Sequence, residues 1–357
     1  MIDLMSLYAT ILPTPKPADL TPPGIFTKDH ENIISTWDAH VGPSDRDGTG
    51  DYEDFWEHAY ALHAVCQYAE NHPSEHVWLS VREGNPKPAT PATPKRTHDE
   101  LKEAITSGEV THYGYISVMS DLNLTIETDA SRYHLDPAFH EYAGRQLHLC
   151  CGEEPDPDDY LPNPDGSPPV TVAEGIVALA ESGATQAVVK ANRVKHGLWT
   201  VPASTDRETA EKTAYDAMDM SLYYLGNNWN SFLVQEHVNM RYEYRVYIVD
   251  RTPVTGAGCI EEFTPLNNTA VFDPMMRENR RTDPGEALDV PERLPDLARR
   301  YTEFAAKFAA ETTIEADYVL DLAVNNQNEI LVVELNSLFN TGMYASNPYR
   351  VVSALTG

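Results

Sequence analysis

Two short apolar runs near residue 325 form the clearest hydrophobic pattern in the chain. They span residues 318–324 and 330–335, and the polar segment Asn325-Asn-Gln-Asn328 lies between them. Apolar runs of this length on either side of a turn-forming cluster predict two strands joined as a hairpin. We therefore expect a β-hairpin over residues 318–336.

From residue 170 onward the pattern stays regular. Thr171-Val-Ala-Glu174 has the form of a capping box, which predicts a helix from there through Glu181. Ser204 or Thr205 is expected to cap a second helix, at 206–224. A third helix presents one apolar face, made by Leu297, Tyr301, Phe304, Ala305 and Phe308. Strands are predicted at 187–191, 198–203, 232–238, 243–250 and 254–260, and a long polar loop at 264–291.

The first 165 residues carry a less regular pattern. Three proline-rich stretches, at 13–23, 86–94 and 155–169, predict extended connectors. Between and after them we expect helices at 52–70, 99–107 and 137–149, and strands at 77–81, 112–119 and 123–128. This mixture favours an α+β or α/β domain over residues 1–165, followed by a second domain over residues 166–357.

Composition narrows the range of partners. The chain has 55 Asp and Glu residues against 26 Lys and Arg, which gives a formal net charge of −29. Nucleic acids and anionic membranes are bound through basic surfaces, so neither is an expected partner. Four cysteines are too few and too scattered for a disulfide framework. No run of 18 apolar residues and no signal-like N-terminus is present, so we expect a cytoplasmic protein.

Oxygen-bearing side chains gather on the predicted hairpin. Glu334 and Asn336 are two residues apart on one strand, so they point from the same face, and pairing brings Asp321 opposite them. Two carboxylates and an amide make a hard oxygen cluster, which suits Mg²⁺ that carries nucleotide phosphates. A solvated hairpin face is the alternative.

Three further segments carry candidate chemistry. Lys190 lies in an apolar strand, so it needs either a partner such as a phosphate or a route to solvent. The strand that ends in Gln235 and Glu236 has the form of an interdomain hinge. Glu243 and Arg245 share a strand face, where they either bind a ligand or form a cross-strand ion pair of little energetic value.

In this order, the strand lysine, the Gln-Glu hinge, the Glu/Arg strand and the Asp…Glu-x-Asn hairpin resemble the ATP-grasp superfamily of ligases. The resemblance is to the D-alanine ligase and glutathione synthetase branches, and nearest to small ATP-grasp proteins of phage and bacterial genomes. It covers roughly residues 167–355. It implies two α+β lobes that grip a nucleotide, preceded here by an N-terminal α/β-type domain, and it implies ATP and Mg²⁺ as cofactors.

The resemblance also implies a role for each matching residue. Contacts to the nucleotide would come from Lys190 at the phosphates, Gln235, Glu236 and Val238 at the adenine, and Glu243 at the ribose. The metal ligands would be Asp321, Glu334 and Asn336. The acyl phosphate or its tetrahedral adduct would be stabilised by Arg245 or by an arginine of the long loop, namely Arg277, Arg280 or Arg281.

Two departures from the family's pattern bear on these roles. Residues 104–189 contain no lysine to serve as the second phosphate-binding lysine, so Lys195 or Arg193 would substitute for it. Val319 stands where the D-alanine ligase branch has an arginine, and that role would pass to Arg245 or to the loop arginines.

The implied activity is Mg-dependent and forms ADP. A substrate carboxylate would be activated as an acyl phosphate, and an amine would then attack it. The substrate would be a small molecule or a peptide. A phosphotransferase and a non-catalytic nucleotide-binding protein with a basic partner are the alternatives.

Overall fold

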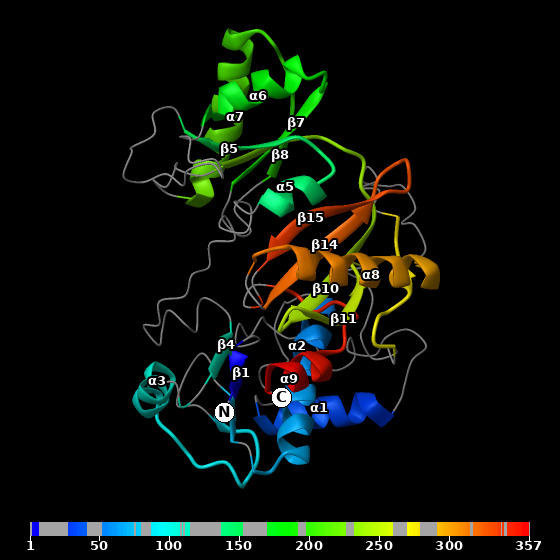
Figure 1. The fold of residues 1–357 in the computed structure, drawn as a ribbon. Helices are drawn as coiled ribbons and strands as arrows, with labels where there is room; N and C mark the ends of the chain where they lie inside the picture. The colour runs from blue at the N-terminus through cyan, green and yellow to red at the C-terminus, as the bar shows by residue number, and fades with distance from the viewer. Residues whose placement is uncertain are drawn as a thin grey trace.

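The computed structural model describes residues 2–6, 28–40, 52–74, 76–79, 87–107, 109, 111–114, 137–152, 170–191, 198–225, 232–259, 270–278, 291–314, 317–336, 338 and 341–356. Figure 1 shows an upper lobe, a central sheet below it, and a group of helices with a small sheet at the bottom. None of the described helices combines the length and the apolar character that a membrane span requires.

The upper lobe is a five-stranded sheet with the order β6-β5-β9-β7-β8. Its strands are β5 (Leu147–Cys151), β6 (Val170–Thr171), β7 (Gln186–Ala191), β8 (Leu198–Pro202) and β9 (Phe232–Glu236). The helices α6 (Val172–Glu181) and α7 (Arg207–Leu225) pack on this sheet, and an apolar core that includes Ile176, Leu179 and Val234 lies between them.

The start of α6 confirms the predicted capping box. The Thr171 hydroxyl accepts a hydrogen bond from Glu174 N at 3.2 Å, and the Glu174 carboxylate accepts one from Thr171 N at 3.0 Å. The cap predicted for α7 was wrong. Asp206, directly before the first helical residue, accepts from Thr209 N at 2.9 Å, whereas Ser204 accepts from Asp206 N outside the helix.

The central sheet is four-stranded and antiparallel, with the order β11-β10-β14-β15. Its strands are β10 (Arg241–Val249), β11 (Thr252–Gly258), β14 (Tyr318–Val324) and β15 (Ile330–Asn336). β14 and β15 confirm the predicted hairpin. β10 and β11 are joined by Asp250 and Arg251, which both have positive φ, 46° and 57°, as a two-residue hairpin turn of the primed type requires.

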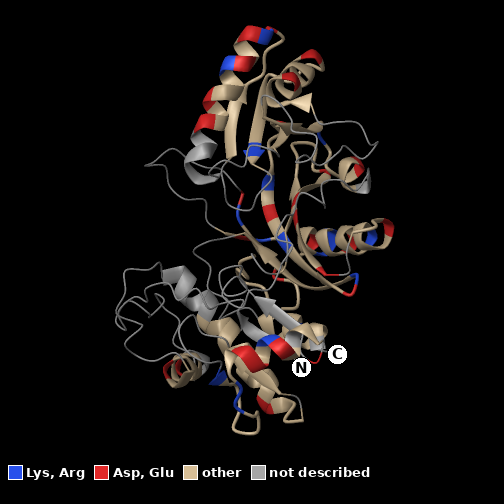
Figure 2. Ribbon diagram, turned by 90° about the vertical axis from the view of Figure 1, so that its left-hand side faces the viewer, with Lys and Arg blue, Asp and Glu red and all other residues tan. Residues whose placement is uncertain are grey.

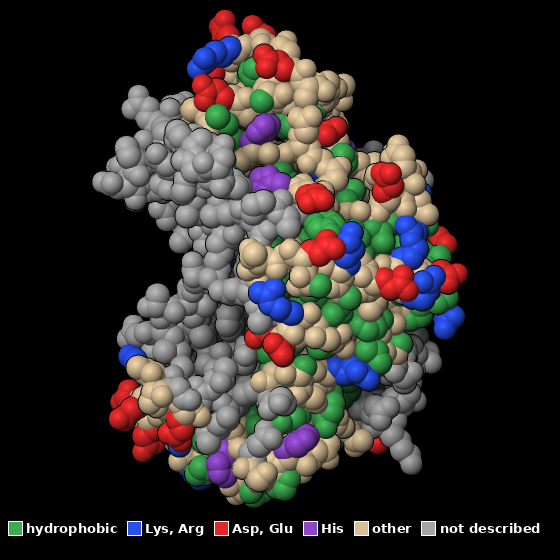
Figure 3. All heavy atoms as spheres, viewed as in Figure 1, with side chains coloured by type: hydrophobic (Ala, Val, Ile, Leu, Met, Phe, Trp, Pro, Cys, Tyr) green, Lys and Arg blue, Asp and Glu red, His purple; other side chains and the backbone are tan. Residues whose placement is uncertain are grey.

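Each face of the central sheet is covered by a different set of helices. On one face, Tyr244, Val246 and Ile248 pack with Tyr301 and Phe308 of α8 (Pro295–Glu311), the helix whose apolar face the sequence predicts. Burial of one such large side chain stabilises the fold by roughly 1.5–3 kcal/mol. The surface over α8 is mixed in charge, as Figure 3 shows, and it carries the pair Arg299–Glu303.

On the other face, one end of the sheet shares an apolar core with three helices, α1 (Lys28–His40), α2 (Tyr52–Asn71) and α9 (Pro348–Thr356), of which α9 contacts β10 and β11 and α1 packs against α2. Tyr247 and Val319 of the sheet lie in the same apolar core as Leu62 and Val351. The other end of this face carries the polar residues described in the next subsection. This face of the sheet therefore has an apolar end, which packs against the helices, and a polar end, which carries the site.

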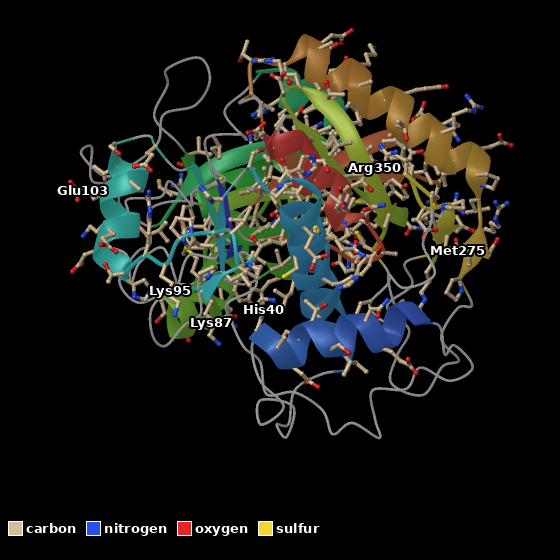
Figure 4. The ribbon with its side chains drawn as sticks, turned by 90° about the horizontal axis from the view of Figure 1, so that it is seen from below. His40, Lys87, Lys95, Glu103, Met275 and Arg350 are labelled. Carbon is tan, nitrogen blue, oxygen red and sulfur yellow. The ribbon has the colours of Figure 1, made fainter. Side chains whose placement is uncertain are left out.

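A small N-terminal sheet has the order β3-β2-β1-β4. Its strands are β1 (Ile2–Ser6), β2 (Val77–Leu79), β3 (Lys87–Pro88) and β4 (Thr111–Gly114), and the helix α3 (His98–Thr106) lies before β4. β1 pairs in parallel with both β2 and β4, as expected for an α/β region. Seen from below in Figure 4, Lys87 lies next to His40, and its ammonium donates to the His40 carbonyl at 2.5 Å.

The helix predicted over 137–149 was wrong. The segment forms a short helix, α5 (Pro137–Tyr142), and then strand β5. Gly144, at φ +63°, ends the helical conformation, and the apolar residues after it pair with β9. As a result, strand pairing in the upper sheet extends across residue 165.

Several predicted elements fall wholly or partly outside the described residues. The proline-rich stretches 13–23 and 155–169 and the strand 123–128 lie outside them, and only residues 112–114 of the strand predicted at 112–119 are described. Of the long polar loop predicted at 264–291, residues 270–278 and 291 are described. They include β12 (Met275–Met276), which pairs with β13 (Glu292–Arg293).

Gly175 gives a stability test of the upper lobe. A Cβ at this position of α6 would lie 2.8 Å from the Cys150 sulfur and 3.2 Å from Val234 Cβ. Helix propensity alone predicts that Gly175→Ala stabilises the helix by about 1 kcal/mol. We expect a lower unfolding midpoint instead, because the helix must move off the sheet. Urea unfolding measures this, and a higher midpoint would contradict the close packing.

Candidate active site

Arg245 and Asp321 form a buried, two-point ion pair at the centre of the polar face. They lie directly opposite each other on β10 and β14. Arg245 Nε donates to Asp321 Oδ1 at 2.8 Å, and an Arg245 terminal nitrogen donates to Oδ2 at 2.7 Å. Burial raises the pKa of the Asp321 carboxyl, and the arginine charge opposes that shift. Arg245 therefore forms a cross-strand ion pair, one of the two alternatives considered for it, but the pair is buried.

The same guanidinium holds the segment that follows β15. Its other terminal nitrogen donates to the Gly342 carbonyl at 3.0 Å, and the Tyr247 hydroxyl donates to that carbonyl at 2.8 Å. The guanidinium carbon lies 4.7 Å from the centre of the Tyr344 ring. Tyr344 has a φ of 46°, which is uncommon for a residue with a side chain. These contacts place residues 341–346 against the site.

Glu334 and Lys190 connect the central sheet with the upper lobe. The Lys190 ammonium, on β7, forms an ion pair with the Glu334 carboxylate, on β15. Burial alone would raise the pKa of Glu334, but the lysine charge and a hydrogen bond from Asn336 lower it to about 2. The two side chains are 23% and 26% exposed, so solvent reaches this contact between the lobes. Figure 2 shows basic and acidic positions close together in this region.

Asn336 joins the two carboxylates. Its amide nitrogen donates to Asp321 Oδ2 at 3.2 Å and to Glu334 Oε1 at 3.0 Å. The three predicted metal ligands therefore converge, as the hairpin pattern indicates. Two carboxylates and an amide are hard oxygen donors, so the donor set fits Mg²⁺, and the amide would turn its oxygen toward the ion. Within the described ranges, no three residues of the types His, Cys, Asp and Glu are grouped to hold a metal ion.

Glu243 lies on β10, two residues before Arg245, and belongs to the same electrostatic cluster. Burial, and after it the negative charges of Asp321 and Glu334, raise its pKa to about 7, against the effect of Arg245 and Lys190. The carboxyl is thus held close to the point at which it loses its proton at neutral pH.

Arg145 is a buried residue that the predicted site does not include. It lies in the turn between α5 and β5, where its Nε donates to the Gln235 side-chain oxygen at 2.9 Å. Burial lowers its pKa to about 10, and the negative charge of Glu334 opposes that shift. With a helix predicted over 137–149, Arg145 would lie inside that helix, so the sequence pattern does not place it in a turn beside the site. The sequence signal that could have indicated this turn is Gly144, directly before Arg145, because glycine often ends a helix.

The structure brings together most of the predicted site residues. Lys190, Glu243, Arg245, Asp321, Glu334 and Asn336 lie in one cluster. Gln235 and Glu236 end β9, and Glu236 N donates to the Gln146 carbonyl at 2.8 Å. Val238 follows in the connection to β10. Lys195, Arg193, Arg280 and Arg281 lie outside the described residues, so their predicted roles stay predictions.

A match to a protein family decides the assignment of this fold. Residues 183–354 match a family that is described as an ATP-grasp domain. This part of the chain is an ATP-grasp domain. Its mixed α/β architecture is that of ATP-grasp proteins, and the cluster around Asp321 and Glu334 lies within the matched residues.

Solved structures of ligases and synthetases are similar to this chain at low identity. The D-alanine-D-alanine ligase from Coxiella burnetii is 13% identical over 73% of this chain and 64% of its own, with a TM-score of 0.36. D-alanyl-alanine synthetase A from Vibrio cholerae O1 biovar eltor str. N16961 is 13% identical over 85% of this chain and 90% of its own, with a TM-score of 0.42.

N5-carboxyaminoimidazole synthetase from Staphylococcus aureus is 11% identical over 82% of this chain and 73% of its own, with a TM-score of 0.40. Because all three TM-scores are below 0.5, the assignment rests on the family match. The chain spans less than two thirds of the length of the Coxiella burnetii ligase. No curated protein matches the chain.

The raised pKa of Glu243 predicts a pH dependence of stability. Its ordinary value is 4.5 and its folded value about 7, so the folded protein holds this proton more tightly than the unfolded chain. The stability this provides is present below pH 4.5 and is lost as the pH rises through 7. Glu243→Gln cannot ionise, so it should be more stable than wild type at about pH 8 and similar to it at about pH 5.

Thermal unfolding in EDTA at both pH values measures this difference. Glu329→Gln, on the exposed turn of the β14–β15 hairpin, serves as the control. If the two variants have parallel pH profiles, Glu243 is not the buried, proton-holding group described here.

Proposed function

We propose that this protein is an ATP-dependent ligase that joins a carboxylate to an amine and releases ADP and phosphate. The observation that carries the proposal is the cluster of Lys190, Asp321, Glu334 and Asn336. It draws residues from both lobes of an ATP-grasp domain to one point. A basic group for phosphates next to hard oxygen ligands is what binding of a metal-bound nucleotide requires.

The proposed nucleotide contacts follow the arrangement of the two lobes. Lys190 would bind the α and β phosphates, since its ammonium reaches the cluster from β7. The end of β9 and the segment after it would hold the adenine, with Gln235, Glu236 and Val238 contributing partly through backbone groups. Glu243 would accept hydrogen bonds from the ribose. Because the Gln235 side chain already binds Arg145, its contribution would come from the backbone.

The proposed metal ligands are Asp321, Glu334 and Asn336. A Mg²⁺ ion bound there would neutralise charge on the transferring phosphoryl group. In the free protein, Arg245 and Lys190 pair with the two carboxylates. Each carboxylate therefore has a compensating cation before any ligand binds.

The proposed reaction has two transfers. A carboxylate oxygen of the substrate attacks the γ-phosphorus, the bond to the β–γ bridging oxygen breaks, and ADP leaves. An amine then attacks the acyl carbon, loses a proton, and the phosphate leaves. This chain's residues orient the groups and neutralise charge. Arg245, Lys195 and Arg280 are the residues we propose for stabilising the acyl phosphate and its adduct.

No covalent nucleophile is needed for this route. Burial raises the pKa of Cys66, Cys150, Cys151 and Cys259, which keeps these thiols protonated.

We propose a small-molecule or peptide substrate and a cytoplasmic location. Residues 1–165 would contribute to the substrate side of the site and residues 166–357 would form most of the ATP-grasp domain, to which β5 adds a strand of the upper sheet.

Glu334→Gln tests the proposed metal site. It keeps the shape of the side chain but removes the charge, so ADP formation should fall by about 100-fold or more, as when a single electrostatic stabiliser is lost. The assay follows ADP release from Mg-ATP in the presence of amino acids and short peptides, with hydroxylamine as the amine. An acyl phosphate would be trapped as a hydroxamate with release of phosphate.

Glu329→Gln is the matched control, since it makes the same chemical change on the exposed turn of the same hairpin. Full activity in Glu334→Gln would reject the metal site. A stable phosphate ester in place of the hydroxamate would identify a phosphotransferase.

A further inference from the structure

The two lobes are joined by two connections that lie side by side. The chain passes from α5 to β5 through residues 143–146, and from β9 to β10 through residues 237–240. Leu147 at the start of β5 pairs with Gln235 near the end of β9, so both connections leave the upper sheet at the same end of its strands. In addition, Asn239, in the second connection, donates a hydrogen bond at 3.0 Å to the side chain of Asn326, which lies in the turn of the β14–β15 hairpin.

The first connection is in tight contact with the central sheet. A Cβ added to Gly144 would lie 3.1 Å from Leu331 Cβ, on β15. Phe139, Ala143 and Leu147 belong to the same apolar core as Val332 and Leu335 of that strand. The turn that carries Arg145 is therefore packed directly on the strand that carries Glu334.

Arg145 spans the junction with four hydrogen bonds. Its Nε binds the Gln235 side chain in the upper lobe at 2.9 Å. Its terminal nitrogens bind backbone carbonyls of the central sheet, Val332 at 2.6 Å and Val333 at 2.7 Å, directly before Glu334. A fourth bond, to the Ala143 carbonyl at 2.8 Å, fixes its own turn. One rigid, planar group thus binds β9 and β15 together.

This use of the guanidinium distinguishes Arg145 from Lys190. The side chain of Lys190 is partly exposed at the contact between the lobes, whereas Arg145 is only 8% exposed and its donors are directed at protein acceptors. A residue that contacts phosphate needs donors directed at the ligand. Arg145 instead directs its donors at the hinge strand and at the strand of the acidic cluster.

We propose that Arg145 is a positioning residue that clamps the hinge strand β9 to β15 and so holds the two lobes in the arrangement that binds nucleotide. The proposal rests on the proposed function for its ligand, but the clamp itself is a property of the free protein. Without the clamp, only a fraction of the molecules would have the lobes correctly placed. The apparent dissociation constant then rises by the inverse of that fraction, by the same factor for every ligand that needs this arrangement.

The first test measures dissociation constants of AMP, ADP and ATP by calorimetry for wild type, Arg145→Gln and Lys190→Gln. The clamp predicts that Arg145→Gln weakens all three by a similar factor, about tenfold if a tenth of the molecules stay competent. Lys190→Gln should weaken binding of ADP and ATP more than binding of AMP, because AMP lacks the β phosphate. A loss in Arg145→Gln that grows with phosphate number would make Arg145 a phosphate ligand and overturn the proposal, as would unchanged affinities.

Arg251 supplies a matched control. Its guanidinium also donates to three backbone carbonyls, those of Ala309, Thr312 and Ile314, but away from the hinge. Arg251→Gln should lower the unfolding midpoint and leave the three affinities unchanged. Equal losses of affinity in Arg251→Gln and Arg145→Gln would show a general effect of stability and reject a specific clamp.

Arg145→Lys is the milder variant, and it separates charge from geometry. A lysine keeps the positive charge near Glu334, but one ammonium cannot reach both Gln235 and the β15 carbonyls in the planar geometry of arginine. The clamp therefore predicts that Arg145→Lys weakens the binding of AMP, ADP and ATP almost as much as Arg145→Gln does. Wild-type affinities in this variant would reduce the role of Arg145 to its charge and overturn the proposal.

A second readout does not depend on nucleotide. Hydrogen exchange of the free protein should be faster for residues 143–147 and 332–334 in Arg145→Gln than in wild type, and unchanged there in Arg251→Gln. Unchanged protection in Arg145→Gln overturns the clamp by itself. If wild type binds none of the nucleotides while the exchange result holds, the proposed function fails and the clamp stands.

Discussion

The buried carboxylate of Asp321 and the half-buried carboxylate of Glu334 impose the main constraint on this fold. An ionised carboxylate removed from water is costly unless a cation and hydrogen bonds compensate it. Asp321 obtains its cation from the neighbouring strand, through Arg245, and Glu334 obtains its cation from the other lobe, through Lys190. Asn336 hydrogen-bonds both. The position of each lobe is thus tied to the electrostatics of two side chains on a single hairpin.

These pairs also explain how so acidic a chain presents a site for an anionic ligand. The net charge of −29 is a property of the chain as a whole, whereas the cluster places two cations beside two carboxylates. In the proposed complex, Lys190 would exchange one anionic partner, Glu334, for another, the nucleotide phosphates, while the metal takes the place of the lysine at Glu334. Both arrangements keep the charges of Lys190 and Glu334 paired, so the exchange carries a smaller electrostatic cost than leaving either charge without a partner.

Local patterns in the sequence predict much of the fold. The hairpin at 318–336 follows from apolar runs around a polar turn, and the start of α6 follows from Thr171 and Glu174. Alternation along β10 correctly separates Tyr244, in the apolar core, from Arg245, in the polar cluster. Each of these inferences needs only residues that are close in sequence.

Partners that are distant in sequence could not be predicted in this way. Lys190 and Glu334 are 144 residues apart, and only the packing of the two lobes brings them into contact. β5 reads as the end of a helix because its apolar residues fit either structure, and its pairing with β9 decides for the strand. With the strand misassigned, Arg145 could not be placed beside Gln235 and Val333.

The central claim is that the cluster of Lys190, Asp321, Glu334 and Asn336 binds a metal-bound nucleotide. The most direct measurement is the thermal unfolding midpoint of wild type and Glu334→Gln with and without Mg-ATP. Ligand at about a hundred times its dissociation constant stabilises the folded state by roughly 2.7 kcal/mol, so the wild-type midpoint should rise by several degrees and the variant's by much less. A midpoint that does not rise in wild type, or that rises equally in both proteins, would contradict this account.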